Sequence, residues 1–105
     1  MATVNSKDCT IVHDGSVIQK LTRPKWDDLE HRKAAQFARN YQQTNNRERY
    51  ARTKTNQYGC RLWTLVLIYA ITIREVEAKH PDRCRAFVDA EAKALIQKRE
   101  AEYVQ

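Results

Sequence analysis

One uncharged run dominates the pattern of hydrophobic and polar positions along the chain. Residues 62 to 73 read Leu-Trp-Thr-Leu-Val-Leu-Ile-Tyr-Ala-Ile-Thr-Ile, in a chain of which 30% of residues are charged. Drawn as a helix, this run has apolar side chains on every face, so the helix must be covered all round. We therefore predict a central buried helix from about residue 57 to residue 79. His80-Pro81 ends it, because the residue before a proline disfavours helical backbone angles.

A second helix is predicted to begin near residue 22. Thr22 or Arg23 would be its N-cap, and Pro24 would lie in the first turn, where a missing N–H is harmless. Apolar residues then recur at roughly helical spacing. The predicted buried stripe is Trp26, Leu29, Ala34, Phe37 and Tyr41. Residues 42 to 46, Gln-Gln-Thr-Asn-Asn, are weak helix formers and should end or bend this helix.

The remaining helical segments are less strongly marked. Residues 47 to 54 form either a short helix or the lead-in to the central one, with a turn expected at residues 53 to 56 and Thr55 or Asn56 as the next cap. Pro81-Asp82 is predicted to open the last helix. Its buried stripe would be Cys84, Phe87, Val88, Ala92, Leu95 and Ile96. Its water-facing residues would be Lys93, Lys98, Arg99, Glu100 and Glu102.

The N-terminal part has a different pattern. Residues 1 to 8 are polar and are expected to be a loose tail. Residues 9 to 21 hold two β-branched runs around Asp14-Gly15, which favours a hairpin with a type I′ turn, either packed on the helices or presented as a docking edge. The expected fold is mainly α: one small domain over residues 1 to 105, with an N-terminal β-hairpin followed by a three-helix arrangement (22 to 105) around the hydrophobic central helix.

The charge is positive and unevenly placed. Nineteen Lys and Arg against thirteen Asp and Glu give a net charge of +6. Residues 32 to 61 hold eight basic residues and the single acid Glu48, a net +7, so the rest of the chain nets −1. A basic segment of this kind attracts nucleic acid or acidic protein surfaces.

Tyrosines are interleaved with these arginines, and Asn, Gln and Thr fill the gaps. Arginine holds phosphates with two N–H groups, and tyrosine stacks on unpaired bases. The leading hypothesis is a small, non-enzymatic regulatory or accessory protein that associates with nucleic acid. The candidate contact residues are Arg39, Arg47, Arg49, Tyr50, Arg52, Lys54, Tyr58 and Arg61. The competing interpretation is a solvated basic face whose tyrosines cover the edge of the core.

The sequence carries little that indicates chemistry. Cys9-x3-His13 and His80-x3-Cys84 have spacings that metal pairs can use, but the first pair falls on the expected hairpin, where residues four apart lie about 13 Å from each other. The sequence offers one candidate for nucleophilic catalysis, which is Cys60 or Cys84 as the nucleophile with His80 as its general base. Without a phosphate-binding loop or an acid pair, we expect no enzyme, no cofactor and no metal.

Two other functional classes remain as alternatives. One is a protein-binding adaptor or inhibitor, of the kind that mobile elements often encode, which docks on a larger machine through Trp26, Tyr50 and flanking arginines. The other is a membrane-embedded subunit, which is disfavoured because twelve residues span about 18 Å of the roughly 30 Å of hydrocarbon. The odd cysteine count and the polar start favour the cytoplasm or the nucleus. A homodimer would help to complete a modest core.

Overall fold

A computed structural model describes residues 26–103, with side chains up to residue 100. This part of the chain folds into four helices, α1 (Asp28–Gln43), α2 (Arg47–Tyr58), α3 (Cys60–Lys79) and α4 (Arg85–Tyr103). The mainly α prediction is confirmed for these residues, whereas the expected three-helix arrangement is corrected to four helices. The predicted hairpin at residues 9 to 21 lies outside the described residues and stays a prediction.

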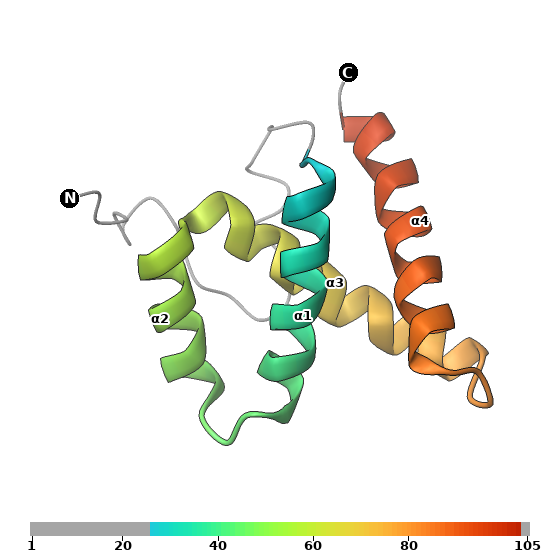
Figure 1. Cartoon of the computed structure of the whole chain (residues 1–105), viewed down its shortest axis with the longest axis horizontal. Helices are drawn as coiled ribbons and strands as arrows, with labels where there is room; N and C mark the ends of the chain where they lie inside the picture. Colours follow the sequence, from blue (N-terminus) through green and yellow to red (C-terminus); the bar gives the residue numbers. More distant parts are fainter. Residues whose placement is uncertain (1–25, 104–105) are drawn as a thin grey trace.

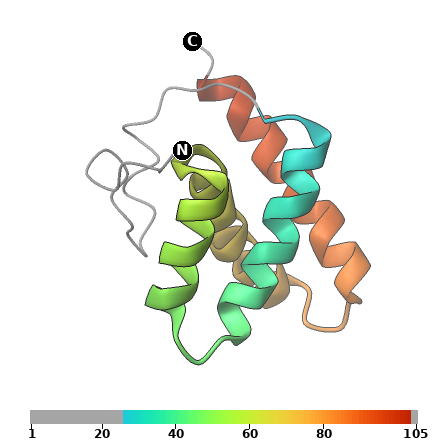
Figure 2. The same cartoon turned by 60° about the vertical axis from the view of Figure 1, so that its left-hand side comes forward.

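Helix α3 is the centre of the packing. In Figure 1, α2, α1 and α4 lie side by side, and α3 crosses behind them. The turned view in Figure 2 shows α1 and α4 running in opposite directions, with α4 crossing behind α1. Each of the other three helices contacts α3. The chain therefore encloses its most apolar segment with three more polar helices.

Burial along α3 confirms the prediction of a helix covered all round. Residues 62 to 70 are all buried, as are Thr72, Ile73 and Val76, while Ile71 is half-buried. Each fully buried Leu, Ile or Val contributes about 1.5–3 kcal/mol relative to exposure. Thr64 lies inside without penalty because its hydroxyl donates to the Cys60 carbonyl at 2.9 Å. The helix ends at Lys79, with His80 as C-cap, as predicted.

The start of α1 differs from the prediction. Asp27, not Thr22 or Arg23, is the N-cap: its carboxylate accepts from the Glu30 N–H at 2.7 Å, and the Glu30 carboxylate accepts from the Asp27 N–H at 2.9 Å. This reciprocal capping box is a stronger start signal than a proline in the first turn. Trp26 therefore precedes the helix. The buried face of α1 is His31, Ala34, Phe37, Ala38 and Tyr41, and Leu29 is 60% exposed.

A glycine separates α2 from α3. The turn predicted at residues 53 to 56 is wrong, because α2 continues through them to Tyr58. Thr55 is compatible with the helix interior since its hydroxyl donates to the Ala51 carbonyl at 2.6 Å. The break falls at Gly59, whose φ of 99° is rarely adopted by residues with a side chain. This change of direction lets the polar α2 leave the axis of the apolar α3.

The start of α4 is also later than predicted. Pro81 and Asp82 belong to a turn, in which the Arg83 N–H donates to the His80 carbonyl at 3.2 Å, and α4 begins at Arg85. The change of direction between α3 and α4 uses these extra residues. Cys84, which we placed on the buried stripe, is therefore exposed before the helix. Val88, Ala92 and Ile96 are buried as predicted, and Phe87 and Leu95 are partly buried.

Candidate nucleic-acid interface

Helix α2 turns one face inward and leaves the opposite face to solvent. Ala51 and Thr55 are its buried residues, four positions apart on the side that meets the core. The exposed residues Arg49, Arg52, Thr53, Asn56 and Gln57 lie on the opposite face, and Arg47 and Glu48 are exposed at the start of the helix. The outer face thus combines arginines with side chains that donate and accept hydrogen bonds.

The charge of α2 is almost uncompensated within the helix. It contains Arg47, Arg49, Arg52 and Lys54 against Glu48 alone. The one ion pair of this helix that the structure describes joins Arg52 Nη2 to Glu48 Oε2 at 3.7 Å, with both side chains mostly exposed. Exposed pairs at this spacing contribute only about 0.3–0.5 kcal/mol. The guanidinium groups of α2 are therefore available to an anionic partner.

Arg39, in contrast, is occupied by acids of the fold. Its side chain is 11% exposed, and its guanidinium donates to Glu77 at 3.0 Å and to Asp89 at 2.7 Å. Burial alone would lower the pKa of Arg39, but the hydrogen bonds and charges of Asp89 and Glu77 outweigh it and raise that pKa. This candidate contact residue joins α1 to α3 and α4 instead of facing an outside partner.

Arg61 is occupied in a similar way at the start of α3. Its Nη1 donates to Glu30 Oε2 at 2.6 Å, and its guanidinium lies 5.3 Å from the centroid of the Trp26 ring. The Trp26 indole N–H donates back to the Arg61 carbonyl at 3.1 Å. Arg61 therefore links Trp26 and the start of α1 to α3. Trp26 is only 8% exposed, so it does not offer the surface anchor that the adaptor alternative needs.

The two candidate stacking tyrosines have different environments. Tyr50 is half-buried in a cluster with Tyr41 and Trp63, whose ring centroids are 6.4 and 6.2 Å from its own, and burial raises the pKa of its hydroxyl. This ring packs α2 against the core and offers less surface than an exposed ring would. Tyr58 is 44% exposed.

Two lysines accompany Tyr58. Lys33 Nζ lies 5.0 Å from the centroid of its ring, and Lys54 Nζ lies 5.7 Å from it while also lying 4.6 Å from that of Phe37. An ammonium over a ring is attracted by the negative face of the π-system. Lys33 was missing from the sequence-based set. The spacing 54 to 58, one helical turn, is the local signal that relates Lys54 to Tyr58, whereas Lys33 meets Tyr58 across two helices.

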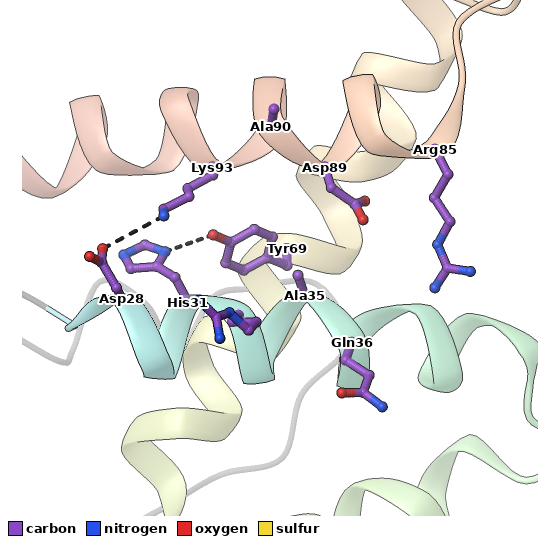
Figure 3. A pocket seen from close by; sticks show the side chains of 10 residues that line it. Asp28, His31, Ala35, Gln36, Tyr69, Arg85, Asp89, Ala90 and Lys93 are labelled. Carbon is purple, nitrogen blue, oxygen red and sulfur yellow. Dashed lines mark hydrogen bonds and ion pairs between the residues drawn. The ribbon is translucent and has the colours of Figure 1, made fainter.

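A cavity of about 360 Å³ opens between α1 and α4 (Figure 3). Asp28 and Lys93 approach each other across it, with Asp28 Oδ1 and Lys93 Nζ 3.6 Å apart. His31 and Tyr69 contribute the buried part of its lining, and Arg85 and Asp89 lie toward the other end. Both charge signs line this cavity, so it does not select for an anion as clearly as α2 does.

A buried network lies beside this cavity. His31 Nδ1 and the Tyr69 hydroxyl are 2.7 Å apart, and His31 Nε2 is 3.2 Å from Glu100 Oε1. The second Glu100 oxygen accepts from the Trp26 backbone N–H at 2.9 Å. Burial and the charges of Glu100 and Asp89 raise the pKa of Tyr69, so its phenol keeps its proton and is a poor nucleophile. The network joins α1, α3 and α4.

Glu100 corrects a sequence-based prediction, because it is 5% exposed and does not face water. It follows Val88, Ala92 and Ile96 at intervals of four on the same helix face. We assigned it to the surface by its charge, although its helical position indicated the buried face. His31, which the sequence analysis does not single out, is also buried, on the same face of α1 as Ala34 and Ala38.

The candidate metal ligands are not brought together among the described residues. His80 is exposed, with its ring in edge contact with Phe87 at 5.2 Å between centroids, and Cys84 has a free, exposed thiol. Cys9 and His13 lie outside the described part. From residue 26 onward, the structure holds no group of three or more His, Cys, Asp or Glu side chains placed to bind a metal.

Comparisons of the chain with protein-family models, curated proteins and solved structures found no match. None of the helices described here combines the length and the apolar character needed to cross a membrane.

Proposed function

We propose that this protein is a non-enzymatic nucleic-acid-binding protein that holds the phosphate backbone of its partner against the outer face of α2. The observation that carries the proposal is a difference in pairing. Arg39 and Arg61 are held by carboxylates at 2.6 to 3.0 Å, whereas α2 presents Arg47, Arg49 and Arg52 with one weakly held acid between them. Arg39 and Arg61 are paired with acids of the fold, and the arginines of α2 are left for a partner.

The residue types on α2 suit this role. Arginine matches phosphate with two parallel N–H groups, and Asn56, Gln57 and Thr53 add side chains that reach sugar or base edges. Tyr58 is the one candidate stacking residue that is substantially exposed, and Lys33 and Lys54 lie next to it. A contact set of this kind binds phosphates first and discriminates weakly between sequences.

The test is the salt dependence of binding to a short fluorescein-labelled oligonucleotide, followed by anisotropy. Log K should fall linearly with log salt concentration, with a slope of about −0.9 per phosphate contacted in a duplex. The double variant Arg49→Gln/Arg52→Gln should weaken binding to unrelated sequences equally and reduce the magnitude of the slope by about 2.

A charge-matched control separates contact from net charge. Lys79→Gln/Lys98→Gln removes two exposed positive charges from α3 and α4. This control should keep nearly the full slope. Binding that does not depend on salt, or an equal loss in both double variants, would overturn the assignment to α2. A partner that stays bound after nuclease treatment and proves to be an acidic protein would favour the adaptor alternative.

A further inference from the structure

A second cavity, of about 260 Å³, lies at the start of α2. It is formed where the end of α1, the start of α2 and the middle of α3 meet. Its lining consists of Tyr41, Gln42, Arg47, Ala70, Ile71 and Arg74. Two arginines from different helices line this cavity, and among residues 26–100 no carboxylate lines it. This is the opposite of the cavity between α1 and α4, whose lining includes two aspartates.

Arg47 is held at the cavity although it is exposed. Its Nη2 donates to the Gln42 carbonyl at 3.3 Å, and its guanidinium carbon lies 5.5 Å from the centroid of the Tyr41 ring. Gln42 is held in turn, because its amide donates to the Ala70 carbonyl at 2.9 Å. A side chain ordered before binding loses less conformational entropy when a ligand arrives.

Arg74 brings the second charge from α3. The two acids nearest to it in sequence are engaged elsewhere, since Glu75 lies 3.8 Å from Arg99 and Glu77 lies 3.0 Å from Arg39. Burial raises the pKa of the Tyr41 hydroxyl, while the charges of Arg47 and Arg74 act to lower it. Both arginines and Tyr41 line the same cavity.

Two like charges that share one cavity repel each other, and a bound anion relieves this repulsion. Arginine is the side chain that holds tetrahedral oxyanions with two N–H donors. We propose that this cavity is a phosphate site, in which Arg47 and Arg74 hold one phosphate group between α2 and α3. The claim that this phosphate belongs to a nucleic-acid strand lying along α2 rests on the proposed function. The claim that the cavity binds phosphate does not.

The first experiment uses inorganic phosphate as the probe. Backbone and side-chain N–H signals of Gln42, Arg47 and Arg74 are followed by NMR during titration. They should shift and saturate in the parent protein and in Lys79→Gln, which removes a charge further along the same helix. In Arg74→Gln the affinity should fall roughly tenfold, as expected for loss of a charge-assisted hydrogen bond. Equal affinity in Arg74→Gln and in the parent would overturn the phosphate site.

The second experiment replaces the probe by an oligonucleotide, with and without a 5′-phosphate. If a backbone phosphate occupies the site, Arg74→Gln should reduce the magnitude of the salt slope by about 1 for both strands. If a terminal phosphate occupies it, only the 5′-phosphorylated strand should respond. Either result supports the site and identifies the source. An unchanged slope with both strands overturns its use by a nucleic acid.

The failure of this site and the failure of the proposed function give different results. If Arg49→Gln/Arg52→Gln weakens oligonucleotide binding while Arg74→Gln changes neither titration, α2 binds nucleic acid and the cavity is not a phosphate site. If phosphate saturates the cavity in an Arg74-dependent way while no oligonucleotide binds, the site stands and the proposed function falls.

Discussion

Helix α2 and the junction of α1 with α4 use charged residues in opposite ways. At the junction, Arg39 meets Asp89 and Glu77, and the buried Glu100 accepts from Trp26 and contacts His31. On α2, three arginines face solvent around a single glutamate. The two regions have similar residue types, so what separates them is where the acids of the chain lie. Charges that the fold pairs hold it together, and charges that it leaves unpaired can bind a partner.

Removing Glu100 should cause the largest loss of stability. Glu100→Ala takes the acceptor from the Trp26 N–H and the partner from His31, both buried. Leaving such groups unsatisfied should lower the free energy of unfolding by about 3 kcal/mol. Urea unfolding followed by circular dichroism measures this. Glu91→Ala, exposed on the same helix, is the control and should cost little. Equal stability of the two variants would show that the buried network contributes nothing.

Tyr69→Phe makes a smaller change in the same network. It removes only the hydroxyl that lies 2.7 Å from His31 Nδ1 and keeps the ring packing. One buried nitrogen loses its partner, so the loss should be about 1–2 kcal/mol. The same unfolding measurement applies, with Tyr58→Phe on the exposed ring as the control. A Tyr69→Phe protein as stable as the control would contradict a structural role for this hydrogen bond.

Alkaline pH should lower the free energy of unfolding. Burial raises the pKa of Tyr69, Tyr41 and Tyr50 above the ordinary value of 10. Above that value the unfolded state has lost protons that the folded state keeps, so unfolding becomes easier as pH rises. Stability should therefore be full below about pH 10 and should fall by about 1 kcal/mol near pH 11. Denaturant unfolding at several pH values measures this, and Tyr69→Phe should show a shallower fall. A flat profile would contradict the prediction.

Arg39→Met should cause the smallest loss of stability among these variants. It keeps the length of the side chain while removing two partly exposed ion pairs, so about 1 kcal/mol should be lost. Arg32→Met, at an exposed position of the same helix, should be neutral within about 0.5 kcal/mol. Thermal unfolding of both variants gives the difference. If the two variants melt together, the Arg39 pairs do not stabilise the junction.

The helical core was predictable because its signal is local. An uncharged run of twelve residues can only be buried, and His80-Pro81 can only end a helix. Helix starts were predicted less well. The reciprocal bonds of Asp27 and Glu30 decided where α1 begins, and a turn of residues 81 to 83 delayed α4. Both depend on side-chain and loop geometry that a proline signal does not report.

The candidate site was predictable in composition but not in pairing. The basic segment was visible at once, yet which of its cations meet an acid depends on residues far away in sequence. Arg39 and Asp89 are fifty positions apart, and Arg61 and Glu30 are thirty-one apart. Arg74 directly follows the apolar run, and no local pattern relates it to Arg47. Its approach to Arg47 depends on how α2 leaves α3 at Gly59, which no local pattern reports.

The most direct test of the account compares two variants of equal net charge, Arg39→Gln/Arg61→Gln and Arg49→Gln/Arg52→Gln, for unfolding free energy and for oligonucleotide affinity at one salt concentration. The first pair should lose stability and keep most of its affinity. The second should keep its stability within about 0.5 kcal/mol and lose affinity. If both variants lose affinity equally, or if the second unfolds as readily as the first, the division between paired and available charges is wrong.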